Sequence, residues 1–354
     1  MTWEQFQQYI VIGIQDGSIY ALIGLGFTII YAVTNIINFA QGEFVMLGGM
    51  CSYMLVDSVD VPTLPTVVIA LLCAAAIGAL IHLLRNRRIN RFILGLMIVL
   101  PLASIPLVLF LYGEFASVEI PVGLASFLPV LMVGAVGAIL YLLSIRTARR
   151  PSILALIIIT IGAALVIRGI AGVLWGDKMH RTPLYWEERT IDVLDATVHT
   201  QVLWILATMV IVAILLQLFL SRTMLGKSLK ACAINPVGAG LMGINPKIMA
   251  LIAFALAAAV GGAIGAVMTP KVGMTYESGF LYGLYGFVAA SLGGFRSPIG
   301  AVFGGFVLGI GRALIIGVDW WLFNSDYKDV WPMVILVVIL LLRSNILAEE
   351  ERLG

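Results

Sequence analysis

Long apolar stretches run through most of this chain, and they restrict its possible folds more than any other feature. They fall at about residues 10–32, 42–57, 64–84, 92–113, 126–146, 152–175, 200–220, 247–269, 280–293, 299–318 and 330–343. Because the bilayer core holds no water, such segments must satisfy their backbone hydrogen bonds internally, as helices. The chain is 61% hydrophobic and 11% charged, more apolar than a water-soluble domain of 354 residues. The sequence therefore predicts an all-α polytopic transmembrane helical bundle, with about 8–11 membrane segments in a single domain over residues 1–354.

Two neighbouring stretches, 280–293 and 299–318, leave the number of crossings open. A stretch of about 14–16 residues is short for a full crossing and is expected as a half-helix or a re-entrant segment. Either 280–293 is re-entrant and 299–318 crosses alone, or the two are halves of a broken pair around Gly293–Pro298. In both cases the loop between them must be buried in protein or line a cavity.

Positive charges predict which side of the membrane each loop faces. If the N-terminus is outside and every stretch crosses, the inner loops hold fourteen Lys and Arg residues and the outer loops hold five. The acidic residues show the reverse bias, apart from the tail Glu349–Glu351. The positive-inside rule therefore predicts that the N-terminus is outside and the C-terminus cytoplasmic. We expect this multi-pass protein in the plasma (inner) membrane. The start Met1–Glu4 lacks a basic region, so we expect no cleaved signal peptide.

A polar, basic segment at 223–247 interrupts the apolar stretches and is predicted to be cytoplasmic. Asn235–Pro236 and Asn245–Pro246 each read as an N-cap followed by proline at the first helical position. The segment is therefore expected to form a helix over about 226–234, a short second helix from 236 and a membrane helix from 246.

The same segment has an amphipathic pattern. Apolar residues recur every four positions at Leu225, Leu229, Ala233 and Val237, and Lys227 and Lys230 lie off that stripe. Two interpretations stay open: a surface for a soluble partner, or an ordinary loop helix with snorkelling lysines.

Polar residues cluster where the first span gives way to the second. Asn35, Asn38, Gln41 and Glu43 follow one another closely at this break. A carboxylate and three amides there either line a solute pathway or hold the broken helix together by side-chain hydrogen bonds.

Two arginines, Arg168 and Arg312, lie several residues inside apolar stretches. A charge at membrane depth is costly unless it is paired or reaches the interface. Each arginine is therefore expected either to pair with a carboxylate such as Asp16 or to snorkel.

Motifs of catalysis and metal binding are not found in the sequence. Gly226-Lys227-Ser228 resembles the end of a phosphate-binding loop, but the required earlier glycine is replaced by Ser221. The three cysteines fit no metal spacing, and the three histidines are scattered. We therefore expect no enzyme activity, no metal and no cofactor in this chain.

Small residues predict close helix packing. Gly-xxx-Gly pairs occur at Gly13/Gly17, Gly261/Gly265, Gly279/Gly283, Gly300/Gly304 and Gly305/Gly309. Such spacing places two glycines on one helix face, where a neighbouring backbone can approach.

Three blocks of the sequence resemble the permease subunits of branched-chain amino acid ABC transporters, and more narrowly the first of their two permeases. The first block is Gly17–Tyr31 followed by Asn38-Phe39-Ala40-Gln41-Gly42-Glu43, the second is Ser221–Asn245, and the third is Ser278–Gly305. The family usually has His where this chain has Gln41, so any pH-dependent role of that position is not carried over. The apolar stretch 92–113 is interpreted as an extra segment relative to the family's usual subunit.

The resemblance implies a permease domain that carries branched-chain amino acids or a similar small solute using ATP hydrolysed by separate subunits. It implies four kinds of partner: a homologous second permease, two cytoplasmic ABC ATPases, an external solute-binding protein and the lipid bilayer, with no nucleic acid. ATP would be bound by the ATPases. The expected coupling residues are Gly226, Lys230, Ala231, Asn235 and Gly243. The expected pathway residues are Asn35, Asn38, Gln41 and Glu43.

Other functions stay open at this point. Relatives also resemble importers of urea, short amides or aromatic acids. In a different class, a self-sufficient channel or secondary transporter would use Asp16, Arg168 and Arg312 as an ion relay. The external loop 176–199 is expected either to anchor at the membrane interface or to receive an external partner.

Overall fold

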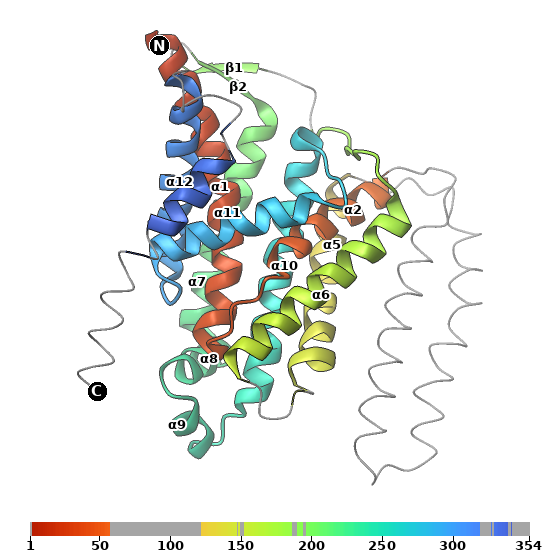
Figure 1. The fold of residues 1–354 in the computed structure, drawn as a ribbon, viewed down its shortest axis with the longest axis vertical. Coiled ribbons are helices and arrows are strands. Elements are labelled where there is room, and N and C mark those ends of the chain that lie inside the picture. Colours follow the sequence, from red (N-terminus) through yellow and green to blue (C-terminus); the bar gives the residue numbers. More distant parts are fainter. Residues whose placement is uncertain are drawn as a thin grey trace.

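The computed structural model describes residues 2–56, 122–146, 148, 152–185, 190–193, 196–318, 327, 329–338 and 341. In these residues the chain is a helical bundle with one short β-hairpin (Figure 1). The helices are α1 (Trp3–Thr34), α2 (Gln41–Val56), α5 (Val122–Leu140), the π-helix η1 (Tyr141–Ile145), α6 (Ile153–Trp175), α7 (Thr200–Arg222), α8 (Met224–Ile234), α9 (Pro236–Leu241), α10 (Pro246–Val272), α11 (Ser278–Gly293) and α12 (Pro298–Val318). Residues 330–338 are also helical. Strands β1 (Thr190–Val193) and β2 (Ala196–His199) pair antiparallel.

The predicted all-α polytopic architecture is confirmed. Among the described residues, six helices are long and apolar enough to cross a membrane: α1, α5 continuing into η1, α6, α7, α10 and α12. The predicted stretch 92–113 lies outside the described residues, and its interpretation as an extra segment stays a prediction.

Two helices, α2 and α11, have 16 residues each and are too short to be among those six. Their first turns meet, because a Cβ added to Gly42 would lie 2.0 Å from the carbonyl oxygen of Gly279. α11 is separated from α12 by a turn at Gly294, whose φ of +81° suits glycine. Of this pair, α12 is long enough to cross alone and α11 is not, as the first of the two alternatives for this region requires.

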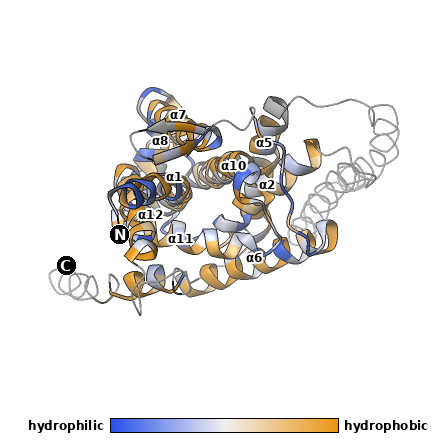
Figure 2. Cartoon of the chain, turned by 90° about the horizontal axis from the view of Figure 1, so that it is seen from above, coloured by the Kyte–Doolittle hydropathy of each residue, from blue (hydrophilic) through white to orange (hydrophobic). Residues whose placement is uncertain are grey.

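The core lies where α1, α2 and α10 pack against one another and against α5, α11 and α12. Large apolar side chains such as Phe27, Phe44 and Phe254 are fully buried there. In contrast, α6 forms one edge of the bundle and is largely hydrophobic (Figure 2). Its outward side chains Leu154, Ile158 and Val173 are exposed, so α6 offers an apolar face to lipid or to another membrane subunit.

The two ends of the bundle differ. Helices α8 and α9 lie at the end opposite to the N-terminus and the β-hairpin (Figure 1). The predicted caps are confirmed: Asn235 Oδ1 accepts from the Gly238 amide, Asn245 Oδ1 accepts from the Lys247 amide, and proline follows each asparagine. The basic segment 223–247 and the described residues of the loop 176–199 therefore lie at opposite ends, as the charge pattern predicts.

The predicted apolar stripe of the basic segment is only partly confirmed, because Leu229 is buried and Ala233 half-buried but its two end members are not. Leu225 is half exposed and Val237 is 73% exposed, whereas Gly226, Leu229 and Cys232 are buried. The reason is that α8 packs through Gly226, whose lack of a side chain lets it approach the backbone of Phe219 in α7. The buried face therefore repeats every three residues, and Val237 belongs to the next helix.

Close packing at the predicted glycine pairs is confirmed. In the α1–α12 contact, a Cβ added to Gly309 would lie 2.2 Å from the Gly17 amide nitrogen, and one added to Gly305 would lie 2.4 Å from the Ala21 amide nitrogen. At Gly311, also in α12, an added Cβ meets no heavy atom within 4 Å. The chain therefore contains its own control for the effect of a methyl group in this helix.

We expect Gly309→Ala to destabilise the protein by about 1–3 kcal/mol, because α1 and α12 must separate. Gly311→Ala gains the same helix propensity without the clash and should be neutral or stabilising by up to about 1 kcal/mol. Thermal unfolding of the purified protein in detergent measures both. Equal melting temperatures for the two variants would contradict the packing described here.

Candidate functional site

The break between α1 and α2 is held by its own polar side chains. Asn35 ends α1 in the left-handed conformation, at φ 53° and ψ 24°, and its Oδ1 accepts a hydrogen bond of 3.0 Å from Arg296. Asn38 Oδ1 accepts from the Ala40 amide at 3.2 Å, an Asx-type turn that leads into α2. Across the bundle, the Thr160 hydroxyl of α6 accepts from the Phe39 amide. For Asn35 and Asn38 the structure thus shows side-chain hydrogen bonds that hold the broken helix together.

Further along the break, Gln41 and Glu43 lie deep in the protein. Both are buried, at 0% and 1% exposure. Gln41 Nε2 donates to the Ala257 carbonyl of α10 at 3.0 Å, and its amide rests where a side chain on Gly26 would otherwise lie. The glycine at 26 therefore makes room for a polar group in the core.

Three polar atoms of this break have no hydrogen-bond partner among the described residues: Asn38 Nδ2, Gln41 Oε1 and Glu43 Oε2. Buried polar atoms in folded proteins are normally paired with protein groups or ordered water. Unpaired donors and acceptors this close in sequence are suited to bind water or the polar groups of a solute.

Glu43 forms an ion pair with Arg168 of α6. Arg168 Nη2 donates to Glu43 Oε1 at 2.5 Å, across 125 residues of sequence. The carboxylate is packed against Gly279 of α11, where a Cβ would lie 2.3 Å from Glu43 Oε2. The guanidinium lies 5.4 Å from the ring centre of Phe280, in a cation–π geometry. The pair thus joins α2, α6 and α11.

A cavity of about 270 Å³ opens beside this pair, between α1, α6 and α11. Its lining is apolar except for Arg168: Phe27, Phe39, Ile161, Ala164, Leu165, Phe280, Gly283, Leu284 and Phe287. Phe287 is central, with its ring centre 5.8 Å from that of Phe27 and 5.7 Å from that of Phe39. The volume is just below the roughly 300–1,000 Å³ typical of small-molecule pockets.

The second intramembrane arginine belongs to a separate network. Arg312 of α12 donates from Nη1 to Asp16 and from Nη2 to Asp329, each at 2.9 Å. Tyr285 of α11 donates to the same Asp329 carboxylate, and its ring lies under the Arg312 guanidinium at 5.3 Å. The expected partner Asp16 is therefore confirmed for Arg312, whereas the partner of Arg168 is Glu43.

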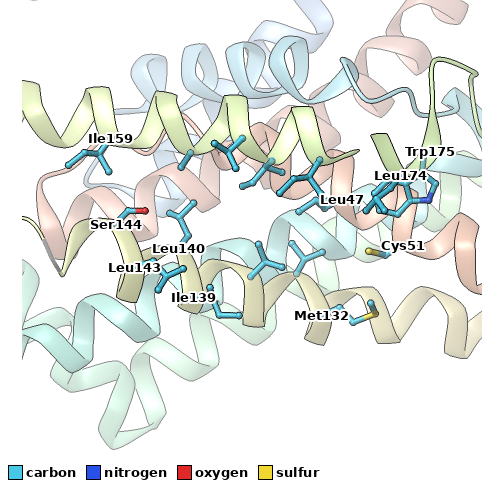
Figure 3. Close-up of a pocket in the computed structure, with 16 residues that line it drawn as sticks. Leu47, Cys51, Met132, Ile139, Leu140, Leu143, Ser144, Ile159, Leu174 and Trp175 are labelled. Carbon is cyan, nitrogen blue, oxygen red and sulfur yellow. The ribbon is translucent and has the colours of Figure 1, made fainter. Parts of the chain in front are cut away.

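A larger cavity, of about 380 Å³, lies on the other side of α6, between α2, α5 and α6 (Figure 3). Figure 3 shows Leu140, Leu143 and the hydroxyl of Ser144 at one end of this cavity, and Leu174 and Trp175 of α6 at the other end. None of its lining residues is charged. It has the chemistry of an acyl-chain or helix-packing surface rather than that of a site for a polar solute.

Helices α8 and α9 expose apolar side chains at the far end of the bundle. Ile234, Leu241 and Met242 are all more than 80% exposed, and the exposed Lys230 is on the same pair of helices. Burial raises the pKa of the Cys232 thiol on the opposite face, so this cysteine stays protonated at neutral pH and is structural. Helices α8 and α9 therefore pack against the bundle through one face and expose the other.

The five expected coupling residues are divided between these faces. Lys230, Asn235 and Gly243 are exposed, Ala231 is half-buried, and Gly226 is buried against α7. Gly243 has a φ of +85°, which suits the turn between α9 and α10. Gly226 therefore positions α8 rather than facing a partner.

Some residues around the α1–α2 break were not singled out from the sequence. Thr160 is polar within an apolar helix, and that was its only signal. The aromatic wall of Phe27, Phe39 and Phe287 has no local signal, because phenylalanine is common throughout membrane proteins. Among the described residues no group of three or more His, Cys, Asp or Glu side chains is placed to hold a metal ion.

Removing the charge of Arg312 should loosen the network that ties Asp329 to α1 and α12. We expect Arg312→Gln to cost about 1–3 kcal/mol, at the low end for a broken ion pair because Asp329 is partly exposed. The double variant Asp16→Asn with Arg312→Gln should lose less than the single variant, since one orphaned carboxylate is removed. Thermal unfolding measures both, and a greater loss in the double variant would contradict the pairing.

Comparisons with known proteins show which family this chain matches. Residues 9–123 and 116–342 match the family described as branched-chain amino acid transport system / permease component. The high-affinity branched-chain amino acid transport system permease protein BraD of Pseudomonas aeruginosa is 28% identical, over 98% of this chain and 97% of its own length. The corresponding protein LivH of Escherichia coli is 25% identical, over 98% of this chain and 96% of its own length. No solved structure matches the chain significantly.

Proposed function

This chain belongs to the family of permease components of branched-chain amino acid transport systems, and we propose that it is the membrane-spanning permease subunit of an ATP-driven importer. In this proposal the ATP is bound and hydrolysed by two separate cytoplasmic subunits, and this chain holds no cofactor. A homologous second permease completes the membrane part, and an external binding protein delivers the solute. The solute is a branched-chain amino acid or a similar small molecule.

The observation that carries the proposal is the exposed apolar surface of α8 and α9. Ile234, Leu241 and Met242 are large apolar side chains at the end of the bundle that also carries the basic residues Lys227 and Lys230. The positive-inside rule places that end in the cytoplasm, with the N-terminus outside. A rigid pair of capped helices with an uncovered apolar face is suited to receive a soluble ATPase and to transmit its movement.

The contacts of the two arginines favour this proposal over a self-sufficient ion-coupled transporter. A relay through Asp16, Arg168 and Arg312 requires these groups to face one another. Instead, Arg312 pairs with Asp16 and Asp329, and Arg168 pairs with Glu43 on another helix. A continuous ionic path through the three named residues is therefore disfavoured.

Reconstitution tests the proposal directly. Proteoliposomes that contain this chain, the second permease, the ATPases and the binding protein should accumulate leucine, isoleucine or valine only when ATP is supplied. Vesicles that contain this chain alone should show no flux. Flux of these amino acids through the chain alone, without ATP, would support the channel or secondary transporter instead.

Charge reversal at Lys230 tests the contact with the ATPases. We expect Lys230→Glu to reduce the amount of ATPase that copurifies with the permease by about tenfold, equivalent to roughly 1.4 kcal/mol, because the exposed lysine faces the partner. The matched control is Lys178→Glu, an exposed lysine at the opposite end of the bundle. If the two variants retain the same amount of ATPase, Lys230 is not in the contact.

A further inference from the structure

The cavity between α1, α6 and α11 combines one cation with an otherwise apolar wall. Arg168 is the charged member of its lining, and Phe27, Phe39 and Phe287 form an aromatic wall. A solute that matches this lining has one anionic group and an apolar remainder. Neutral solutes such as urea or short amides offer no group that needs the guanidinium.

The guanidinium of Arg168 is incompletely used. It has five N–H donors, and among the described residues its one carboxylate partner is Glu43, through Nη2. Its buried Nε has no hydrogen-bond partner among the residues that the structure describes. Arg312 also has a buried Nε without a partner among the described residues, but it binds two carboxylates where Arg168 binds one. Arg168 is thus held by one carboxylate through Nη2, and its other N–H groups can begin a contact with a second carboxylate before Glu43 is displaced.

The side chain of Glu43 is similarly half satisfied. It is 98% buried, and its Oε2 has no hydrogen-bond partner among the described residues. A buried ion pair whose hydrogen-bond donors and acceptors are not all paired contributes little to stability compared with an apolar pair of the same shape. A role in stability alone therefore explains the pair poorly.

We propose that Arg168 anchors the carboxylate of the transported amino acid, and that Glu43 occupies the guanidinium until the solute arrives. This inference rests on the proposed transport function and assigns a recognition site to it. The planar guanidinium binds a carboxylate through two parallel hydrogen bonds, so it selects acids over amides. The aliphatic side chain of the solute lies against Phe27, Phe39 and Phe287, and Glu43 and the solute compete for the same cation.

A cysteine reporter on the cavity wall tests the site without the binding protein. The complete membrane complex carries Leu165→Cys, with Cys51, Cys73 and Cys232 replaced by alanine, and its rate of labelling by N-ethylmaleimide is measured. Leu165 lines the cavity and is 59% exposed. Leucine should slow the labelling, and 4-methylpentanoate, which keeps the carboxylate and lacks the amine, should slow it too. Leucinamide, which keeps the amine and lacks the carboxylate, should not.

Two substitutions should change, in opposite directions, the leucine concentration that halves the labelling rate. Arg168→Gln should raise it about tenfold or more, because the charge-assisted hydrogen bonds are lost. Glu43→Gln should lower it, because a neutral amide competes less strongly for the guanidinium. If the pair is only structural, both variants weaken protection alike, and that result would overturn the proposal.

Folding and transport controls keep the outcomes separate. Arg168→Gln leaves a buried carboxylate unpaired, so the double variant with Glu43→Gln removes both charges and should protect as weakly as Arg168→Gln. If the parent complex imports leucine with its binding protein but leucinamide protects as well as leucine, or leucine does not protect, the anchor is wrong and the transport function stands. If the parent complex imports no amino acid, both the carboxylate anchor and the proposed transport function are contradicted.

Discussion

The need to satisfy backbone polar groups inside the membrane is the constraint on which the rest of the structure depends. The chain breaks between α1 and α2, and residues 36–39 lie outside the hydrogen-bond ladders of both helices. The side chains of Asn38 and Thr160 accept hydrogen bonds from the backbone amides of Ala40 and Phe39, and this fixes where α2 starts. Because α2 begins inside the bundle, Gln41 and Glu43 are placed in the core rather than at a surface.

Glycine makes this arrangement possible in three dimensions. Gly26 leaves room for the amide of Gln41, and Gly279 leaves room for the carboxylate of Glu43. Since neither polar side chain would fit beside a Cβ, the small residues that allow tight packing also create the polar interior. Helix packing and the candidate pathway are therefore consequences of the same sequence pattern.

Local features of this fold were predictable from the sequence, whereas of the two long-range arginine pairings only that of Arg312 with Asp16 was among the expected alternatives. The Asn–Pro caps place the starts of α9 and α10 correctly, because a cap is decided by neighbouring residues. The buried face of α8 was predicted only at Leu229, since the rest of it depends on the approach of Gly226 to α7. The pairing of Arg168 with Glu43 spans 125 residues, and periodicity gives no information on such a contact. The site could be predicted as a cluster of polar residues, but its cation and its aromatic wall required the tertiary structure.

The position of α6 connects the ion pair with transport. This helix borders an apolar cavity on one side and the Arg168 cavity on the other, and its outer face is exposed. Its polar ties to the bundle include Thr160 at the break and Arg168 at Glu43, both of which end at the start of α2. A group that competes with Glu43 for Arg168 would weaken one of these ties, and α6 has little buried apolar surface to hold it otherwise. Recognition of a carboxylate at Arg168 would thereby be coupled to movement of α6 relative to α2, which is the kind of link between binding and conformation that a transporter requires.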